Sequence, residues 1–193
     1  TRMGKEVIKE MNRVGIVVDM SHSAEKSSLD AIEISEKPIA ITHANPSFWH
    51  NAKRNKSNDL LKALANSGGM IGLSMYPHHL LDGSNCTLES FCTMVAKTAE
   101  LIGVEHIGIG SDLCLNQSDS VVDWMRNGTW TKTKDFGEGS AEQPSFPKQP
   151  DWFKDTSGFN NIEQGLKAIG FNDNEIGGIL GNNWFNFYKN YIN

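Results

Sequence analysis

Two short apolar runs that each end in a histidine constrain the fold more than any other feature of this 193-residue chain. Residues 14–22 read VGIVVDMSH, and residues 37–43 read KPIAITH. Runs of this length that are rich in β-branched residues indicate strands buried on both faces, as in a parallel sheet. Because a helical segment lies between them, both strands would deliver their histidines, His22 and His43, at the same edge of the sheet. Two neighbouring imidazoles are the outline of a metal site.

Helices and strands alternate along the chain. Strands are expected at residues 16–20, 38–42, 70–75 and 106–110, and helices at 3–13, 23–34, around 60–67 and at 87–102. Strict alternation predicts an α/β fold with a parallel sheet and right-handed crossovers. A four-stranded α/β sandwich fits this order. Half of an eight-stranded (β/α) barrel fits better, because the polar residues of interest follow the carboxyl ends of strands.

The helices carry apolar residues at helical spacing. The second helix would be capped by Ser23 and would turn Leu29 and Ile32 inward, and the first of two closing helices would turn Ile162, Leu166 and Ile169 inward. The last helix opens with the capping box of residues 172–175.

Residues 113–158 stand apart, because they show little periodicity and many Gly, Pro, Lys and Trp residues. We therefore expect residues 1–193 to form a single portion of one domain. Residues 113–158 would be a long loop insertion after the last strand.

Four polar residues follow the predicted strands: His22, Arg54 and His43, with Asp112 at the end of the last strand. Neutral imidazoles suit Zn²⁺, a nearby carboxylate suits proton transfer from metal-bound water, and a guanidinium suits a substrate carboxylate. One histidine at a strand end is more often a capping or hydrogen-bonded residue. Two of them, with a later Gly-Ser-Asp, favour the metal site.

Other polar residues have more ordinary interpretations. His78 and His79 are adjacent in a loop, which indicates surface exposure, with substrate contact as the alternative. His106 is interpreted as structural, and His50 as either structural or exposed. Asp19 would either orient a histidine or make an internal hydrogen bond.

The composition excludes some classes of partner. The net charge is −5 with no basic stripe, so no nucleic-acid partner is expected. No apolar run is long enough for a membrane span. Three cysteines without zinc-like spacing favour reduced thiols, and hence a cytoplasmic over a secreted setting unless a signal precedes Thr1.

At these motifs the sequence resembles the membrane dipeptidase (renal dipeptidase) family of zinc peptidases, within the amidohydrolase superfamily. The resemblance covers nearly the whole chain apart from the long loop. The segments that carry it are residues 10–22, 37–43, 53–55, 68–72, 104–112 and 180–183.

The resemblance implies a (β/α)₈ TIM barrel, of which this chain would be the C-terminal half, about strands 5–8. It implies a zinc-dependent dipeptidase that hydrolyses the peptide bond of dipeptides with metal-activated water. By the same resemblance, His22 and His43 are ligands in a two-zinc site. Arg54 binds the substrate carboxylate, and Asp112 acts in amine binding or proton transfer.

Two departures from the family pattern matter. The family's His-x-Asp pair, its bridging glutamate and a substrate-binding histidine have no counterpart here, so we expect them upstream of Thr1 and expect this fragment alone to be inactive. Residues 112–115 read DLCL where the family has DFDG, so Cys114 replaces a second carboxylate. Another amidohydrolase activity, of lactonase or deaminase type, therefore stays open, as do a non-catalytic interaction module and a homodimer.

Overall fold

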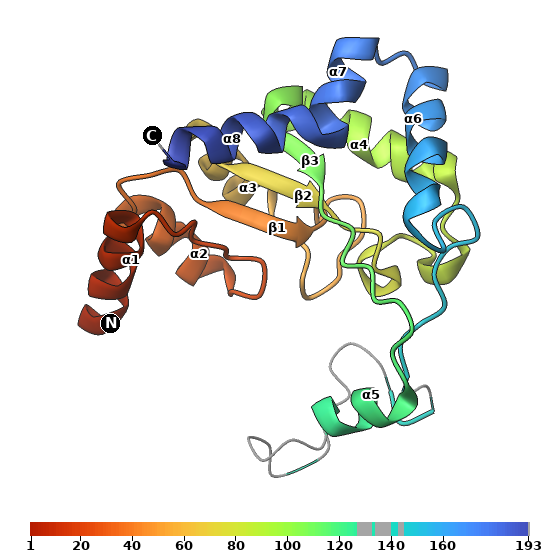
Figure 1. Ribbon diagram of the computed structural model, residues 1–193, viewed down its shortest axis with the longest axis horizontal. Coiled ribbons are helices and arrows are strands. Elements are labelled where there is room, and N and C mark those ends of the chain that lie inside the picture. Colours follow the sequence, from red (N-terminus) through yellow and green to blue (C-terminus); the bar gives the residue numbers. More distant parts are fainter. Residues whose placement is uncertain (127–132, 134–139, 143–144, 193) are drawn as a thin grey trace.

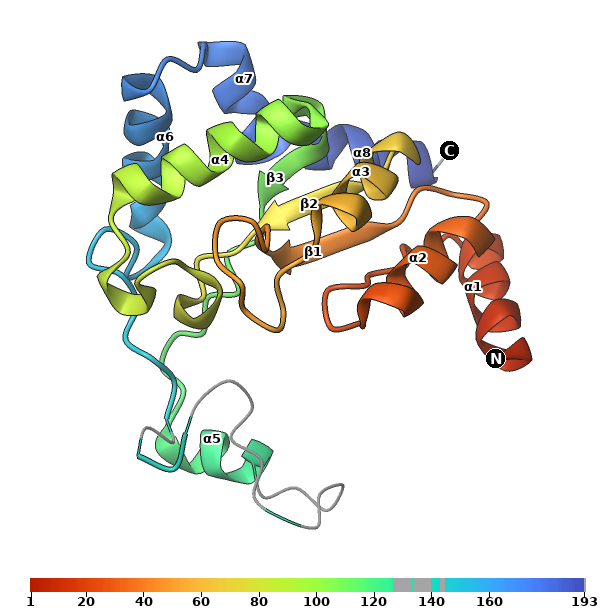
Figure 2. The same ribbon diagram turned by 180° about the vertical axis from the view of Figure 1, so that it is seen from behind.

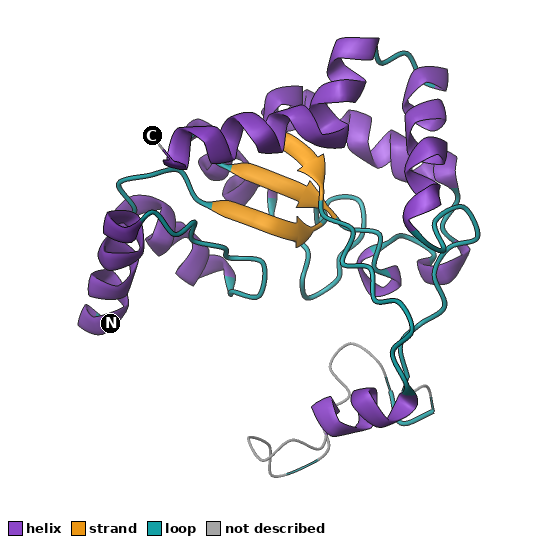
Figure 3. Cartoon of the chain, viewed as in Figure 1, coloured by secondary structure: helices purple, strands orange, loops and turns teal. Residues whose placement is uncertain are grey.

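A small parallel sheet forms the centre of the protein in this computed structural model, which describes all residues except 127–132, 134–139, 143–144 and 193. Its strands, in the order β1-β2-β3, are Ala40–Ala44, Met70–Leu73 and Ile107–Ile109. Both pairs are parallel, and the three arrows point the same way (Figures 1 and 3). The α/β class predicted from the alternation of elements is confirmed.

The first expected strand is the main error of the prediction. Residues 16–20 make a single parallel bridge, between Asp19 and Ala40, in place of a strand. Two backbone hydrogen bonds hold this segment beside β1: the Met20 N–H donates to Ala40 O, and the Ala40 N–H donates to Val18 O, each at 2.9 Å. The segment lies at the edge of the described sheet and is paired with β1 at this one bridge.

Helices pack on both faces of the sheet. The longer helices are α1 (Arg2–Val14), α2 (Glu25–Ile34), α3 (Asn58–Asn66), α4 (Leu88–Ile102), α6 (Phe159–Ala168) and α8 (Asn183–Ile192). Shorter elements are α5 (Asp119–Arg126), α7 (Asp173–Gly177), the 3₁₀ turns Pro77–His79, Gly83–Asn85, Val104–His106 and Thr156–Gly158, and the π turn Gly178–Asn182. Each described helix is too short or too polar to span a bilayer.

Successive strand residues point to opposite faces, and this alternation explains the two apolar clusters. Ile41 and Ile71 belong to the large cluster, which includes the apolar residues of α3 and α4. Ala40 and Met70, one residue earlier, pack instead with Phe187 of α8. Figure 2 shows α3 and α4 on one side of the sheet with α8 behind it.

The apolar pattern places most helices correctly and fails where small residues decide the packing. The N-cap of α2 is Ala24 rather than Ser23, and no side chain caps it. Leu29 is 37% exposed, because α2 buries Ser28 and Ala31 instead. Small side chains let this helix approach its neighbours closely.

The closing helices agree better with the prediction. Ile162 and Leu166 are fully buried, and the capping box between Asn172 and Glu175 is present. Ile169 is 39% exposed, because α6 ends at Ala168 and the chain turns there.

The stretch 113–158 contains a helix that the prediction lacked. This helix, α5, extends away from the sheet at the end of two connecting segments (Figure 1). Its Val122 is buried, whereas Trp124 is 65% exposed. The parts of the predicted loop at 127–132, 134–139 and 143–144 lie outside the described residues.

Candidate metal centre

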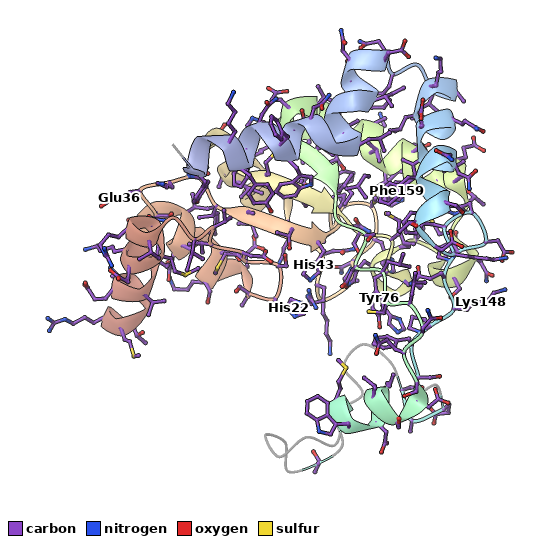
Figure 4. The ribbon with its side chains drawn as sticks, in the orientation of Figure 1. His22, Glu36, His43, Tyr76, Lys148 and Phe159 are labelled. Atoms are coloured by element: carbon purple, nitrogen blue, oxygen red, sulfur yellow. The ribbon has the colours of Figure 1, made fainter. Side chains whose placement is uncertain are left out.

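The two predicted histidines lie side by side at the carboxyl end of β1. His43 belongs to β1, and His22 follows the extended segment paired with that strand. Their Nε2 atoms are 2.9 Å apart, and the rings meet edge to face with centroids 5.0 Å apart. Figure 4 shows both rings below the end of β1. Parallel pairing of the two segments therefore produces the juxtaposition that the sequence predicted.

A hydrogen-bonded chain sets the tautomer of His43. The Thr42 hydroxyl donates to the Asp19 Oδ2 at 2.7 Å and lies 2.9 Å from the His43 Nδ1. An ionised carboxylate only accepts, so the Thr42 hydrogen is committed to Asp19 and His43 must donate its Nδ1–H to Thr42. The His43 Nε2 then carries a lone pair, which is the form that binds a metal.

Asp19 is itself held ionised by several donors. Its carboxylate accepts from the backbone N–H of Ser21 at 3.0 Å and of Thr42 at 3.1 Å, and from both hydroxyl groups. Burial acts to raise the pKa of Asp19, but these hydrogen bonds together lower it below its ordinary value. Asp19 thus combines the two roles considered for it: an internal hydrogen-bond acceptor whose bonds extend to a histidine.

The pKa of His22 shows which charges surround it. Burial lowers this pKa most, and the charges of Arg54 and His43 lower it further, while the carboxylates of Asp112 and Asp19 act to raise it. The other three residues predicted for the site, His43, Arg54 and Asp112, therefore all lie close enough to His22 to act on its pKa. The net effect keeps His22 neutral at pH 7, as metal ligation requires.

Arg54 donates a hydrogen bond to the turn that carries His22. Its Nε donates to the Ser21 carbonyl oxygen at 3.3 Å, and its Nη2 is buried without a hydrogen-bond partner among the described residues. A buried donor without an acceptor is costly, and an anionic group of a ligand would supply the missing acceptor. This fits the predicted carboxylate-binding role.

Asp112 follows β3 in an unusual backbone conformation. Its φ is +53°, in the left-handed region that few residues other than Gly adopt. Strain of this kind is common where a side chain is held for function.

His79 and His106 lie outside the centre, and their surroundings show whether the predicted exposure of the first and the predicted structural role of the second are right. His79 is fully buried, so its predicted surface exposure is wrong; its Nδ1 lies 2.9 Å from the Ser74 hydroxyl. His106 is held by the Gly69 carbonyl oxygen at 2.9 Å, as a structural residue would be.

Two buried asparagines, Asn45 and Asn55, connect the loops around the centre by hydrogen bonds. Neither was predicted as a site residue. Asn45 is fully buried, donates to the carbonyl oxygens of Ser74 and His79, and accepts from the Ser74 N–H. The Asn55 side chain accepts from the Asn45 N–H and donates to the His79 carbonyl oxygen. Asn55 directly follows Arg54 in the motif segment 53–55, and Asn45 lies two residues after His43, so closeness in sequence to the predicted site residues was the available signal.

The residues present fit part of a zinc site. In a tetrahedral site, two nitrogens at normal zinc distances are about 3.3 Å apart, close to the 2.9 Å between the Nε2 atoms of His22 and His43. Zinc takes at least three protein ligands, and the described residues contain no cluster of three or more His, Cys, Asp or Glu residues suited to a metal. The pair could supply two of the ligands that such a site needs.

A family model and individual relatives of known name agree on one family for this chain. The family model described as membrane dipeptidase (peptidase family M19) matches residues 1–124. The chain is 33% identical to dipeptidase tcpJ of Claviceps purpurea over 110 residues, which is 56% of this chain and 26% of that protein. It is 33% identical to dipeptidase verJ of Clonostachys rogersoniana over 112 residues, 58% of this chain and 29% of that protein.

Solved structures agree along nearly the whole chain. An amidohydrolase from Pseudomonas aeruginosa superposes with a TM-score of 0.89 at 27% identity, over 99% of this chain and 57% of that one. A metallo peptidase from Rhodobacter sphaeroides, liganded with a phosphinate mimic of the dipeptide L-Ala-D-Ala, gives 0.77 at 21% identity, over 98% and 46%. The second likeness shows the fold alone. The matched segment thus spans under a third of the curated relatives, and the chain about half of the solved ones.

Proposed function

Because this chain belongs to the membrane dipeptidase family of metallopeptidases, we propose that it contributes part of the active site of a zinc-dependent dipeptidase. The observation that carries the proposal is the 2.9 Å approach of the His22 and His43 Nε2 atoms at the carboxyl end of parallel strands. Barrel enzymes keep their catalytic groups at that end of the strands. We propose that the chain forms the part of a (β/α)₈ barrel that holds strands 5–8, with the singly bridged segment 16–20 in the position of the first of them.

The chain's own residues would have separate roles. His22 and His43 would hold zinc, and the hydrogen bond from His43 to Thr42 would orient one imidazole. Arg54 would bind the terminal carboxylate of the dipeptide, which restricts the substrate to this length. Asp112 would accept and return the proton of the attacking water, or hold the substrate amine. The chemistry that zinc supplies when bound is polarisation of the amide carbonyl and of a water molecule.

The number of ligands limits what the chain does by itself. With two imidazoles and no third ligand among the described residues, residues 1–193 alone should bind zinc weakly and leave dipeptides intact. We propose that a complete site holds two zinc ions, with the other ligands on a part of the protein outside this chain. Dipeptide hydrolysis by the isolated chain would contradict this.

A substrate panel tests the proposed activity. The full-length protein should hydrolyse dipeptides and leave the matching dipeptide amides, which lack the carboxylate, largely intact. Arg54→Met should raise KM for dipeptides about tenfold or more, because a charge-assisted bond worth roughly 1.5–3 kcal/mol is lost. Equal rates on dipeptides and their amides would overturn the role of Arg54, and no dipeptide turnover at all would overturn the proposed activity.

A second candidate is hydrolysis of a different amide or ester by the same site. Cys114 stands where the resemblance places a second carboxylate, and one structural relative is described as an amidohydrolase. Adding cyclic amides, lactones and dipeptides of both stereochemistries to the panel separates the two. Turnover of the cyclic compounds alone would favour this candidate.

A further inference from the structure

Lys56 is a buried cation that the proposed chemistry does not use. It is 3% exposed, and lysine is almost never this buried unless its ammonium group has partners. Its Nζ lies 3.4 Å from the Met20 carbonyl oxygen, 3.1 Å from that of Ser21 and 3.0 Å from that of Ser23. An ammonium has three hydrogens to donate, so these three acceptors match its capacity.

The three acceptors belong to one turn, residues 20–23, and they flank His22 on both sides. A side chain that binds the carbonyl groups before and after a residue restrains the backbone of that residue from two directions. The Ser21 carbonyl oxygen also accepts from the Arg54 Nε at 3.3 Å. Beyond the turn, the Ser57 hydroxyl donates to the carboxylate of Glu25 in the first turn of α2.

The segment that carries Lys56 is in turn fixed to the sheet. The Lys56 N–H donates to the Asn45 carbonyl oxygen, and the Ser47 N–H donates to the Lys56 carbonyl oxygen, each at 2.8 Å. The neighbouring Asn55 reaches in the other direction, to the carbonyl oxygens of His50 and His79. Lys56 therefore links the His22 turn to a hydrogen-bonded segment that is paired with the residues following β1, the strand that carries His43.

We propose that Lys56 is a positioning residue that holds the turn of residues 20–23 so that His22 faces His43. The inference rests on the proposed zinc site and deepens it. Without the ammonium, three buried carbonyl groups lose charge-assisted hydrogen bonds and the turn can relax. The His22 Nε2 then no longer sits at a fixed distance from the His43 Nε2, and the pair loses its preorganisation for a shared metal ion.

The test is zinc affinity of the full-length protein, measured by competition with a chromophoric chelator, together with melting of the zinc-free form. Lys56→Met keeps the length of the side chain and removes the charge, and we expect zinc affinity to fall by about 10–100-fold. Lys62→Met is the matched control, since Lys62 is exposed on the adjacent helix α3, and it should bind zinc like the wild type. Lys56→Arg, which keeps the charge and the donors, should restore most of the affinity.

The outcomes separate positioning from simple support of the fold. A lower melting temperature of Lys56→Met with zinc affinity within threefold of the wild type would overturn the inference. If Lys56→Met does not melt cooperatively, Lys56→Gln, which keeps an amide donor, takes its place in the test. A lower melting temperature of Lys56→Gln with zinc affinity within threefold of the wild type would then overturn the inference. Zinc affinity decides this inference, whereas turnover of dipeptides decides the proposed function, so a protein that binds zinc but cleaves no dipeptide would leave the role of Lys56 intact.

Discussion

The hydroxyl group of Thr42 joins the side chains of Asp19 and His43. Thr42 donates to the Asp19 carboxylate at 2.7 Å and lies 2.9 Å from the His43 Nδ1. The arrangement links an ionised carboxylate to the ring of a proposed ligand, whose opposite nitrogen, Nε2, faces the Nε2 of His22. Such outer partners commonly affect metal affinity nearly as much as the ligands themselves.

Removing the hydroxyl should weaken metal binding without destroying the fold. Thr42→Val keeps the shape of the side chain but breaks the hydrogen bonds of the hydroxyl with Asp19, Ser21 and His43. Zinc affinity should therefore fall by about 10–100-fold, and unfolding should become about 1–2 kcal/mol easier. Thr42→Ser should behave like the wild type. Titration of the full-length protein with zinc checks this, and equal affinities for the Val and Ser variants would show that the hydroxyl does not orient His43.

The ionised state of Asp19 should appear as an acid-dependent stability. Its pKa in the folded protein lies below the ordinary value of 3.8, so its contribution is fully present above that pH. The contribution is lost as the pH falls through the lower, folded-state pKa. At pH 7 the zinc-free Asp19→Asn variant should be less stable by roughly 1 kcal/mol, because Asp19 is exposed and solvent screens its charge-assisted hydrogen bonds.

Urea unfolding from pH 7 to pH 3, in the presence of a chelator, measures this difference. The gap between wild type and Asp19→Asn should stay constant to about pH 4 and narrow only below it. A gap that closes between pH 7 and pH 5 would indicate a histidine as the titrating group instead.

Asp112 should be important for activity and unimportant for stability. Its left-handed backbone, with φ at +53°, is tolerated by Asn and favoured by Gly. Asp112→Asn should therefore change the free energy of unfolding by less than about 0.5 kcal/mol, while kcat/KM for a dipeptide falls by about 10²–10⁴-fold. Asp112→Gly, which relieves the backbone, should be equally inactive. Full activity in either variant would remove Asp112 from the mechanism.

The three free cysteines should differ sharply in reactivity. Burial is the main cause that raises the pKa of Cys86 to about 11 and of Cys92 to about 12, whereas Cys114 is exposed. Because the thiolate is the reactive form, iodoacetamide should label Cys114 first, by roughly tenfold or more over the others. Peptide mass spectrometry of a time course measures the order, with unfolded protein as the control in which all three react alike. Early labelling of Cys92 would contradict the described core.

The spacing of apolar residues was sufficient to predict those helices in which large apolar side chains determine the buried face. Leu60, Leu61 and Leu64 on α3, and Phe91 and Val95 on α4, are all buried as their helical spacing indicates. The juxtaposition of the two histidines was also predictable, because parallel strands joined by a helix bring their carboxyl ends to one edge.

Features that depend on contacts between residues far apart in the sequence were not predictable. The inward side of α2 is chosen by its small residues Ser28 and Ala31 rather than by Leu29. Lys56 carries a charge that suggests exposure, and the carbonyl groups that hold it lie 33 to 36 positions earlier in the chain. Local patterns contain no information about such partners, so the support of the His22 turn emerges only in three dimensions.

The zinc content of two single variants tests the central claim most directly. His22→Ala and His43→Ala of the full-length protein should each lose at least one of the bound zinc ions, because the two Nε2 atoms that are 2.9 Å apart would share the metal. His106→Ala serves as the control, since that ring is bonded to a backbone carbonyl outside the centre, and it should keep the wild-type content. Metal analysis after gel filtration gives the answer. Loss of zinc in both site variants and not in the control is the predicted result, and undiminished zinc in either site variant would contradict it.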